Sequence, residues 1–153
     1  MPDQNASYLR VPPHAEEAEV SVLGAMMLDK EAVSKALQHL DHTAFYKDAH
    51  QLIFRAMMEL FNEGQPIDQV SVIDRLKRMK QLDKAGGAYY VTGLVESTPS
   101  SANVEYYAKI VLEKSILRKL IISANDIQTE AYEAKDSAID ILDGAEQRIF
   151  ALS

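Results

Sequence analysis

The sequence predicts an all-α protein with a compact helical head followed by a long antiparallel helical hairpin. Apolar residues recur at three- and four-residue spacing, and no persuasive strand pattern interrupts them. From Val104 to Tyr132 there is neither glycine nor proline, so a single helix of about 45 Å is expected there. We therefore divide the chain into a disordered N-terminal arm (1–11), a helical head (12–100) and a helical hairpin (101–153).

The first half of the head is predicted to hold three helices. A proline pair at 12–13 precedes a helix that begins near Ala15, because proline fits the first helical turn. Gly24 lies on the apolar face of this helix and indicates close approach of another helix. Two further helices are expected over Glu31–Leu40 and Lys47–Glu63, separated by a break and ended by glycine and proline.

The second half of the head is predicted to hold two short helices. Ser71-Val-Ile-Asp74 resembles a capping box, with aspartate in the usual glutamate position, and predicts a helix over 71–80. A glycine pair at 86–87 breaks the chain. A short helix is expected over Tyr89–Val95, before a loop rich in serine, threonine and proline at 97–101.

The predicted hairpin consists of a long helix over 104–132, a turn near 133–137 and a last helix over 138–150. Eight of the thirteen residues in Ile110–Ile122 are apolar, and they cover an arc of roughly 280°. A helix that packs against a single partner needs an apolar stripe only somewhat over 100° wide. We expect self-association to cover the excess, although the head could instead fold back over it. The residues assigned to self-association are Ile110, Leu112, Ile116, Leu117 and Leu120.

Composition limits the classes of protein to which the chain can belong. Its 153 residues carry 16 basic against 23 acidic side chains, a formal net charge of −7, which argues against unaided binding of nucleic acid. There is no cysteine, so disulfides and thiolate metal sites are excluded. No apolar run is long enough for a membrane span, and the N-terminus does not resemble a signal peptide. We expect a cytoplasmic protein that does not bind membranes.

Catalytic signatures are missing from the sequence. It contains no phosphate-binding G-x-x-x-x-G-K-[ST] loop, no G-x-S-x-G elbow and no Glu-x-x-His pair. His39 and His42 could face one way, but a zinc site would need a third ligand. We interpret all four histidines, including His14 and His50, as ordinary surface or capping residues. No catalytic residue, metal site or enzymatic activity is predicted for this chain.

Two further features are open to more than one interpretation. The segment 75–84 holds five basic residues and one acidic residue, so it is either a solvated helix face or a contact for single-stranded nucleic acid. No aromatic platform for stacking bases accompanies it. The adjacent pairs Tyr89-Tyr90 and Tyr106-Tyr107 each split about 100° apart on a helix. One member of each pair is expected to pack inward, and the other is a candidate interface anchor.

Several short segments between residues 12 and 150 form an ordered set. They are Pro12-Pro13 with Glu17-Ala-Glu19 and Ser21-Val-Leu-Gly24; Ala44-Phe-Tyr46 with His50 and Ile53-Phe54; Gly64-Gln-Pro-Ile-Asp68; Gly86-Gly87 with Tyr90; Pro99-Ser-Ser-Ala-Asn103; Tyr107-Ala-Lys-Ile-Val111 with Glu113-Lys114; and Leu142-Asp143, Ala145-Glu146 and Ile149-Phe150. Taken in order, these segments resemble the N-terminal domain of DnaB-type replicative helicases.

The resemblance implies a module for interaction with other proteins. In that family the hairpins of neighbouring subunits pair, and dimers assemble into a hexameric collar that also receives the C-terminal domain of the DnaG-type primase. A helicase loader is a further candidate partner, and DNA is contacted only through the full-length ring. By motif position, the residues resembling primase contacts are Glu17, Tyr90, Ile121 and Ile127.

One departure from the family pattern is the length of the chain. The sequence stops at Ser153, without the family's ATPase domain and its nucleotide-binding motifs. We therefore expect a fragment of a longer protein that neither hydrolyses ATP nor unwinds DNA by itself. Its resemblance implies no cofactor in this domain, because ATP and Mg²⁺ belong to the missing C-terminal domain.

Overall fold

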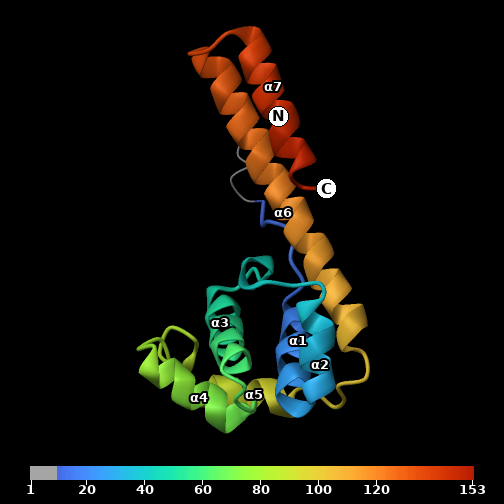
Figure 1. Cartoon of the computed structure of the whole chain (residues 1–153), viewed down its shortest axis with the longest axis vertical. Coiled ribbons are helices and arrows are strands. Elements are labelled where there is room, and N and C mark those ends of the chain that lie inside the picture. The colour runs from blue at the N-terminus through green and yellow to red at the C-terminus, as the bar shows by residue number, and fades with distance from the viewer. Residues whose placement is uncertain (1–9) are drawn as a thin grey trace, which may run out of the picture. The chain divides into compact units, whose positions relative to one another are not determined.

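The computed structural model describes residues 10–153 and confirms the predicted all-α fold for that part of the chain. It divides into two compact units (Figure 1). The head spans His14–Ser115, and the second unit combines residues 10–13 with Ile116–Ser153. The predicted disordered arm falls mostly on residues 1–9, which lie outside the described residues.

Helices follow the order that the sequence predicts, and most ends differ by two residues or fewer. The exception is the second helix, which ends at Leu37 where we expected Leu40, because residues 38–39 form a turn. The elements are α1 (Glu16–Leu28), α2 (Lys30–Leu37), the 3-10 helix η1 (His42–Ala44), α3 (Asp48–Asn62), α4 (Gln69–Arg78), α5 (Gly87–Glu96), α6 (Val104–Glu133) and α7 (Ala138–Phe150).

Each helix of the head contributes apolar side chains to one core. α1 contributes six buried apolar residues and α3 five, whereas Phe61 near the end of α3 is 46% exposed. The large side chains that are fully buried include Leu23, Met26, Phe45, Ile53, Phe54, Met57, Leu76 and Leu94. Burial of this set against the neighbouring helices stabilises the head through the hydrophobic effect.

Gly24 marks the predicted close approach of two helices. A β-carbon added at this position would lie 2.0 Å from the Thr98 hydroxyl oxygen and 2.5 Å from the Leu94 carbonyl oxygen. Thr98 itself donates to the Leu94 carbonyl at 2.9 Å, so the end of α5 is fixed against α1. Glycine at residue 24 therefore allows α1 and α5 to pack at backbone distance.

The start of α4 corrects one prediction. We expected Ser71 to be the N-cap with Asp74 as its partner, but the N-cap is Asp68 and Ser71 occupies the third helical position. The Asp68 carboxylate accepts from the Ser71 backbone N–H at 2.8 Å, and the Ser71 hydroxyl accepts from the Asp68 backbone N–H at 2.9 Å. The capping box is therefore present with its two residue types exchanged, three residues earlier than predicted.

The boundary between the head and the hairpin lies later in the chain than the predicted start of the hairpin at residue 101. The first turns of α6 belong to the head, because Val104, Ala108, Val111 and Ser115 are buried there. Ile110 and Leu112 pack partly against the same core. The apolar arc of this helix is thus partly covered by the head up to Ser115.

The second unit is an antiparallel hairpin of α7 against the C-terminal part of α6 (Figure 1). Arg148 of α7 bonds the carboxylates of Asp126, at 3.2 Å, and Glu130 of α6. From Ile116 to Ser153 every residue is at least partly exposed to solvent, so the hairpin has no buried core of its own. No helix in residues 10–153 has the length and apolar character that a membrane span requires.

Candidate functional site

A buried polar chain links three helices of the head. Glu19 of α1 and His50 of α3 are 1% and 0% exposed, and 2.7 Å separates the Glu19 Oε1 and His50 Nδ1 atoms. On the other edge of the imidazole, Nε2 lies 2.6 Å from the hydroxyl oxygen of Tyr90 in α5. The other Glu19 oxygen accepts from the Tyr46 backbone N–H at 2.8 Å. We call Glu19, His50 and Tyr90 the buried relay.

Lys47 connects the buried relay to the surface. Its ammonium group lies 3.3 Å from the Tyr90 hydroxyl oxygen, 4.8 Å from the centre of the Tyr90 ring and 3.1 Å from the Glu16 carboxylate. The hydrogen bond from Lys47 lowers the pKa of the Glu16 carboxyl, and the same bond raises the pKa of Lys47. Both side chains are more than one-third exposed, so solvent weakens the pair.

Gly86 lies against the ring of Tyr90. It is the N-cap of α5, with φ of +97°, a conformation that L side chains rarely adopt. A β-carbon there would lie 2.8 Å from two ring carbons of Tyr90. The Tyr90 ring also stacks on the His50 ring, with centroids 5.9 Å apart and planes 16° apart. Tyr90 is therefore oriented by contacts to both its ring and its hydroxyl.

The interpretation of His50 as a surface or capping residue is wrong. The side chain is fully buried because both ring nitrogens have polar partners inside the head, which removes the cost of burying an imidazole. One signal could have found it: His50 stands three, four and seven residues before Ile53, Phe54 and Met57, which form the buried stripe of α3. Glu19, whose carboxylate pairs with His50, lies on a different helix, and no spacing in the sequence indicates this pair.

The residues predicted to contact primase lie in two separate units. In the head, Tyr90 is half-buried, and Glu17 is exposed on the first turn of α1. Glu17 lines a surface groove with Ala15, Glu16, Val20, Ser21 and Ser97. In the hairpin, Ile121 is 46% exposed and Ile127 is half-buried. These placements leave all four side chains accessible in part, as a docking residue requires.

The hairpin presents exposed apolar side chains on both of its helices. Ile116, Leu117 and Leu120, which we assigned to self-association, are 40%, 39% and 43% exposed. On α7, Ile139 and Phe150 reach 71% and 81%. Because a pair of helices with no buried residue gains little from its own packing, this surface is a candidate interface.

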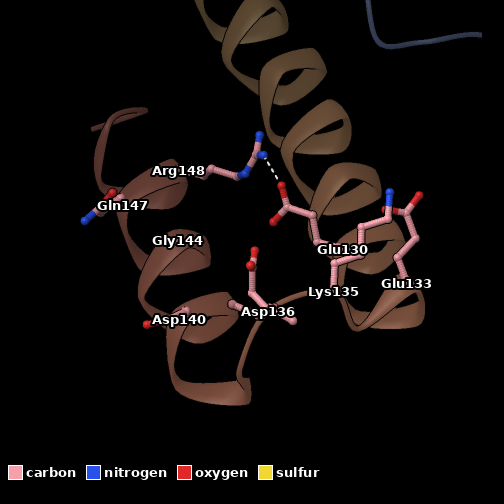
Figure 2. Close-up of a pocket in the computed structure, with 9 residues that line it drawn as sticks. Glu130, Glu133, Lys135, Asp136, Asp140, Gly144, Gln147 and Arg148 are labelled. Carbon is pink, nitrogen blue, oxygen red and sulfur yellow. Dashed lines mark hydrogen bonds and ion pairs between the residues drawn. The ribbon is translucent and has the colours of Figure 1, made fainter.

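A cleft near the turn of the hairpin is lined mainly by charged side chains (Figure 2). Acidic groups predominate, but Arg148 projects into it and bonds Glu130. Residues 10–153 contain no group of three histidine or acidic side chains that could hold a metal ion. The lining acidic residues are Glu130, Glu133, Asp136 and Asp140.

Comparisons with known proteins identify the family. The DnaB-like helicase N-terminal domain matches residues 11–113. The chain belongs to this family. It is 43% identical over 144 residues to the replicative DNA helicase DnaB of Geobacillus stearothermophilus and 42% identical to the replicative DNA helicase DnaC of Bacillus subtilis. Both alignments cover 94% of this chain and 32% of the relative, so the chain spans about a third of their length.

Solved structures agree with that assignment. The crystal structure of the N-terminal domain of DnaB helicase from Mycobacterium tuberculosis superposes with a TM-score of 0.88 at 36% identity, covering 94% of this chain and all of the other. A second structure, described as a DnaB-like replicative helicase and its interactions with primase, gives a TM-score of 0.75 at 26% identity. It covers 91% of this chain and 32% of that helicase.

In this DnaB-like domain the basic segment 75–84 is partly neutralised. The Arg75 guanidinium bonds the carboxylates of Glu59, at 3.2 Å, and Glu63, and Arg78 pairs with Asp74 at 3.1 Å. The bond from Arg75 lowers the pKa of the Glu63 carboxyl. Contact with nucleic acid through this segment would have to compete with these pairs, so the structure adds nothing that favours it.

The two tyrosine pairs divide as the helical geometry predicts. Tyr89 is 92% exposed while Tyr90 is half-buried, and Tyr106 is 64% exposed while Tyr107 packs partly against the core. The exposed members stay candidates for interface anchors in this domain.

Proposed function

We propose that this domain is the non-catalytic collar module of a hexameric replicative DNA helicase. In this role it joins subunits through the hairpin and receives the C-terminal domain of a DnaG-type primase, which couples priming to unwinding. The observation that carries the proposal is the hairpin, whose apolar side chains have no core of their own to fill. A second copy of the hairpin would supply the missing partner surface, and ATP and Mg²⁺ would act only in a separate ATPase domain.

The docking of primase rests on different support. One structural neighbour of this fold is described with its interactions with primase. We assign the docking role to Glu17, Tyr90, Ile121 and Ile127, which include one exposed charge, one fixed aromatic ring and two accessible apolar side chains. Apolar and aromatic anchors would supply most of the affinity, and Glu17 at the rim would tune the choice of partner.

Substitution of the two hairpin isoleucines tests the docking role. Ile121→Asp and Ile127→Asp each introduce a carboxylate where an apolar contact is proposed, so we expect primase affinity to fall by about tenfold or more. The measurement is calorimetric titration of the primase C-terminal domain into each variant, with helical content checked by circular dichroism. Gln128→Glu, at an exposed position on the same helix, is the control. Unchanged affinity in both isoleucine variants would remove the assignment.

A further inference from the structure

The hydrogen bonds of the buried relay allow the direction of each one to be assigned. The Glu19 carboxylate accepts from two backbone N–H groups, at 2.8 Å and 3.4 Å, so each of its oxygens acts as an acceptor. His50 Nδ1 therefore donates to Glu19. In the neutral imidazole that tautomer makes Nε2 an acceptor, so the Tyr90 hydroxyl donates to it.

The hydrogen bond from Lys47 to Tyr90 favours the neutral tautomer of His50. The ammonium of Lys47 already donates to the Tyr90 oxygen. If His50 were an imidazolium, its Nε2–H would donate to the same oxygen, and the Tyr90 hydroxyl proton would lose its acceptor in the relay. With neutral His50 each donor in the chain from Lys47 through Tyr90 and His50 to Glu19 meets an acceptor.

We propose that Glu19 and His50 are positioning residues for the docking surface around Tyr90. They hold the ring in one orientation and direct the hydroxyl proton inward to His50, so that a partner meets an ordered ring and no free hydroxyl donor. This inference rests on the proposed docking role of Tyr90. Gly86 supports it independently, because the Tyr90 side chain occupies the space that a β-carbon at residue 86 would fill.

Preorganisation explains how residues that a partner does not touch can affect binding. A side chain that is already ordered in the free protein loses less conformational entropy when a partner covers it. His50 is 0% exposed and Glu19 1%, so neither can form more than a marginal contact with a partner. Any effect of His50 on docking must therefore pass through Tyr90 or through the fold itself.

Two amide substitutions of His50 separate these two routes. The amide of glutamine reaches about as far as Nε2 of histidine, so it can still accept a hydrogen bond from the Tyr90 hydroxyl. The amide of asparagine reaches only the position of Nδ1, so it can form a hydrogen bond to Glu19 but not to Tyr90. Both bury a neutral amide, so each keeps one of the two polar contacts of the imidazole. A role in the fold alone predicts that the two variants bind a partner equally once folded. A positioning role predicts that they differ.

The test measures the affinity of the primase C-terminal domain for wild type, His50→Gln, His50→Asn, Tyr90→Phe and the double variant His50→Asn/Tyr90→Phe. Titrations are run below the melting temperature of every variant, as set by circular dichroism. We expect His50→Asn and Tyr90→Phe each to weaken binding by about fivefold to tenfold, the effect of one lost hydrogen bond. His50→Gln should bind nearly as wild type, and the double variant no more weakly than either single variant.

Three outcomes would overturn the proposal, and they can be told apart. Equal affinities for the glutamine and asparagine variants would show that His50 serves only the fold. Losses from His50→Asn and Tyr90→Phe that multiply in the double variant would show that the two residues act separately. If either His50 variant does not fold, Tyr90→Phe alone decides, because unchanged affinity would contradict a relay that acts through its hydroxyl. A wild-type domain that does not bind primase at all would instead reject the proposed function.

Discussion

At the scale of single residues, Glu19 shows why a buried charge can be tolerated in the head. Its two oxygens receive N–H groups from Tyr46, Lys47 and His50, so the carboxylate keeps hydrogen-bond partners in place of water. Removal of this side chain would leave those donors without their acceptor in the interior. A buried group with several partners is therefore more costly to delete than its exposed neighbour Glu17.

The pair formed by Lys47 and Glu16 gives a prediction for pH. The pKa of Glu16 is lowered in the folded head, so the pair stabilises the fold above the ordinary glutamate pKa and this contribution is lost as pH falls through the lowered value. The pKa of Lys47 is raised, so the contribution is also lost as pH rises through that raised value. An exposed pair of this kind contributes at most about 1 kcal/mol.

Replacement of Lys47 tests this interpretation directly. Lys47→Met removes the side-chain hydrogen bond that is the largest cause of the lowered Glu16 pKa, so we expect this pKa to rise toward its ordinary value. The measurement is an NMR titration of the Glu16 carboxyl carbon. Lys119→Met, at an exposed lysine of the hairpin, serves as the control and should leave Glu16 unchanged. A Glu16 pKa that does not move in Lys47→Met would refute the assigned cause.

Residue-level predictions from sequence succeeded where a local signal existed. Gly24 stood on an apolar helix face, and its smallness indicated a helix contact that the structure confirms. Helical geometry likewise predicted one inward member in each tyrosine pair. The buried relay could not be predicted, because tertiary packing brings its members together. Glu19 and His50 are separated by 31 positions in the sequence, and His50 and Tyr90 by 40. Chain spacing contains no information about which carboxylate meets which imidazole.

At the scale of elements, α4 shows how a capping residue is chosen. Asp68 precedes Ser71 by three residues, which is the same spacing that separates Ser71 from Asp74. Both stretches therefore have the spacing of a capping box, with one aspartate and one serine each. The structure uses the first of them: the helix begins at Gln69, and Val72 and Leu76 are its buried residues.

The capping box predicts the stability of variants at the start of α4. Asp68→Ala and Ser71→Ala each remove a side-chain partner of a backbone N–H, so each should lower the free energy of unfolding by about 1 kcal/mol. Urea denaturation followed by circular dichroism measures this change. Asp74→Ala, which loses only an exposed pair with Arg78, should change it by less than about 0.5 kcal/mol. A larger cost at Asp74 than at Asp68 would restore the original assignment.

Helices were the most predictable elements because their apolar spacing and the glycines and prolines between them are local signals. All seven predicted helices are present in residues 10–153. The division between units was less predictable. A helix without interruption, such as α6, gives no sign of where the head ends, and only the burial of its first turns shows that the head extends to Ser115.

At the scale of the whole molecule, the apolar surface is unevenly distributed. The head has a core of fully buried large apolar side chains, whereas the apolar residues of Ile116–Ser153 are all at least partly exposed. Contiguous exposed apolar surface usually marks an interaction site. The sequence predicted this excess from the width of the apolar arc, but the identity of the covering partner depends on other chains and is a proposal.

Light scattering after size exclusion tests the central claim, that the hairpin is one half of an interface between copies. The domain is measured over a range of concentrations, alone and with the primase C-terminal domain, beside Leu117→Asp/Leu120→Asp and the control Asn125→Asp on the same helix. We predict a dimer or larger assembly that grows with concentration and co-elutes with primase. The double variant should remain monomeric, and Asn125→Asp should behave as wild type. A wild-type domain that stays monomeric at every concentration, or a double variant that associates as wild type does, would contradict the claim.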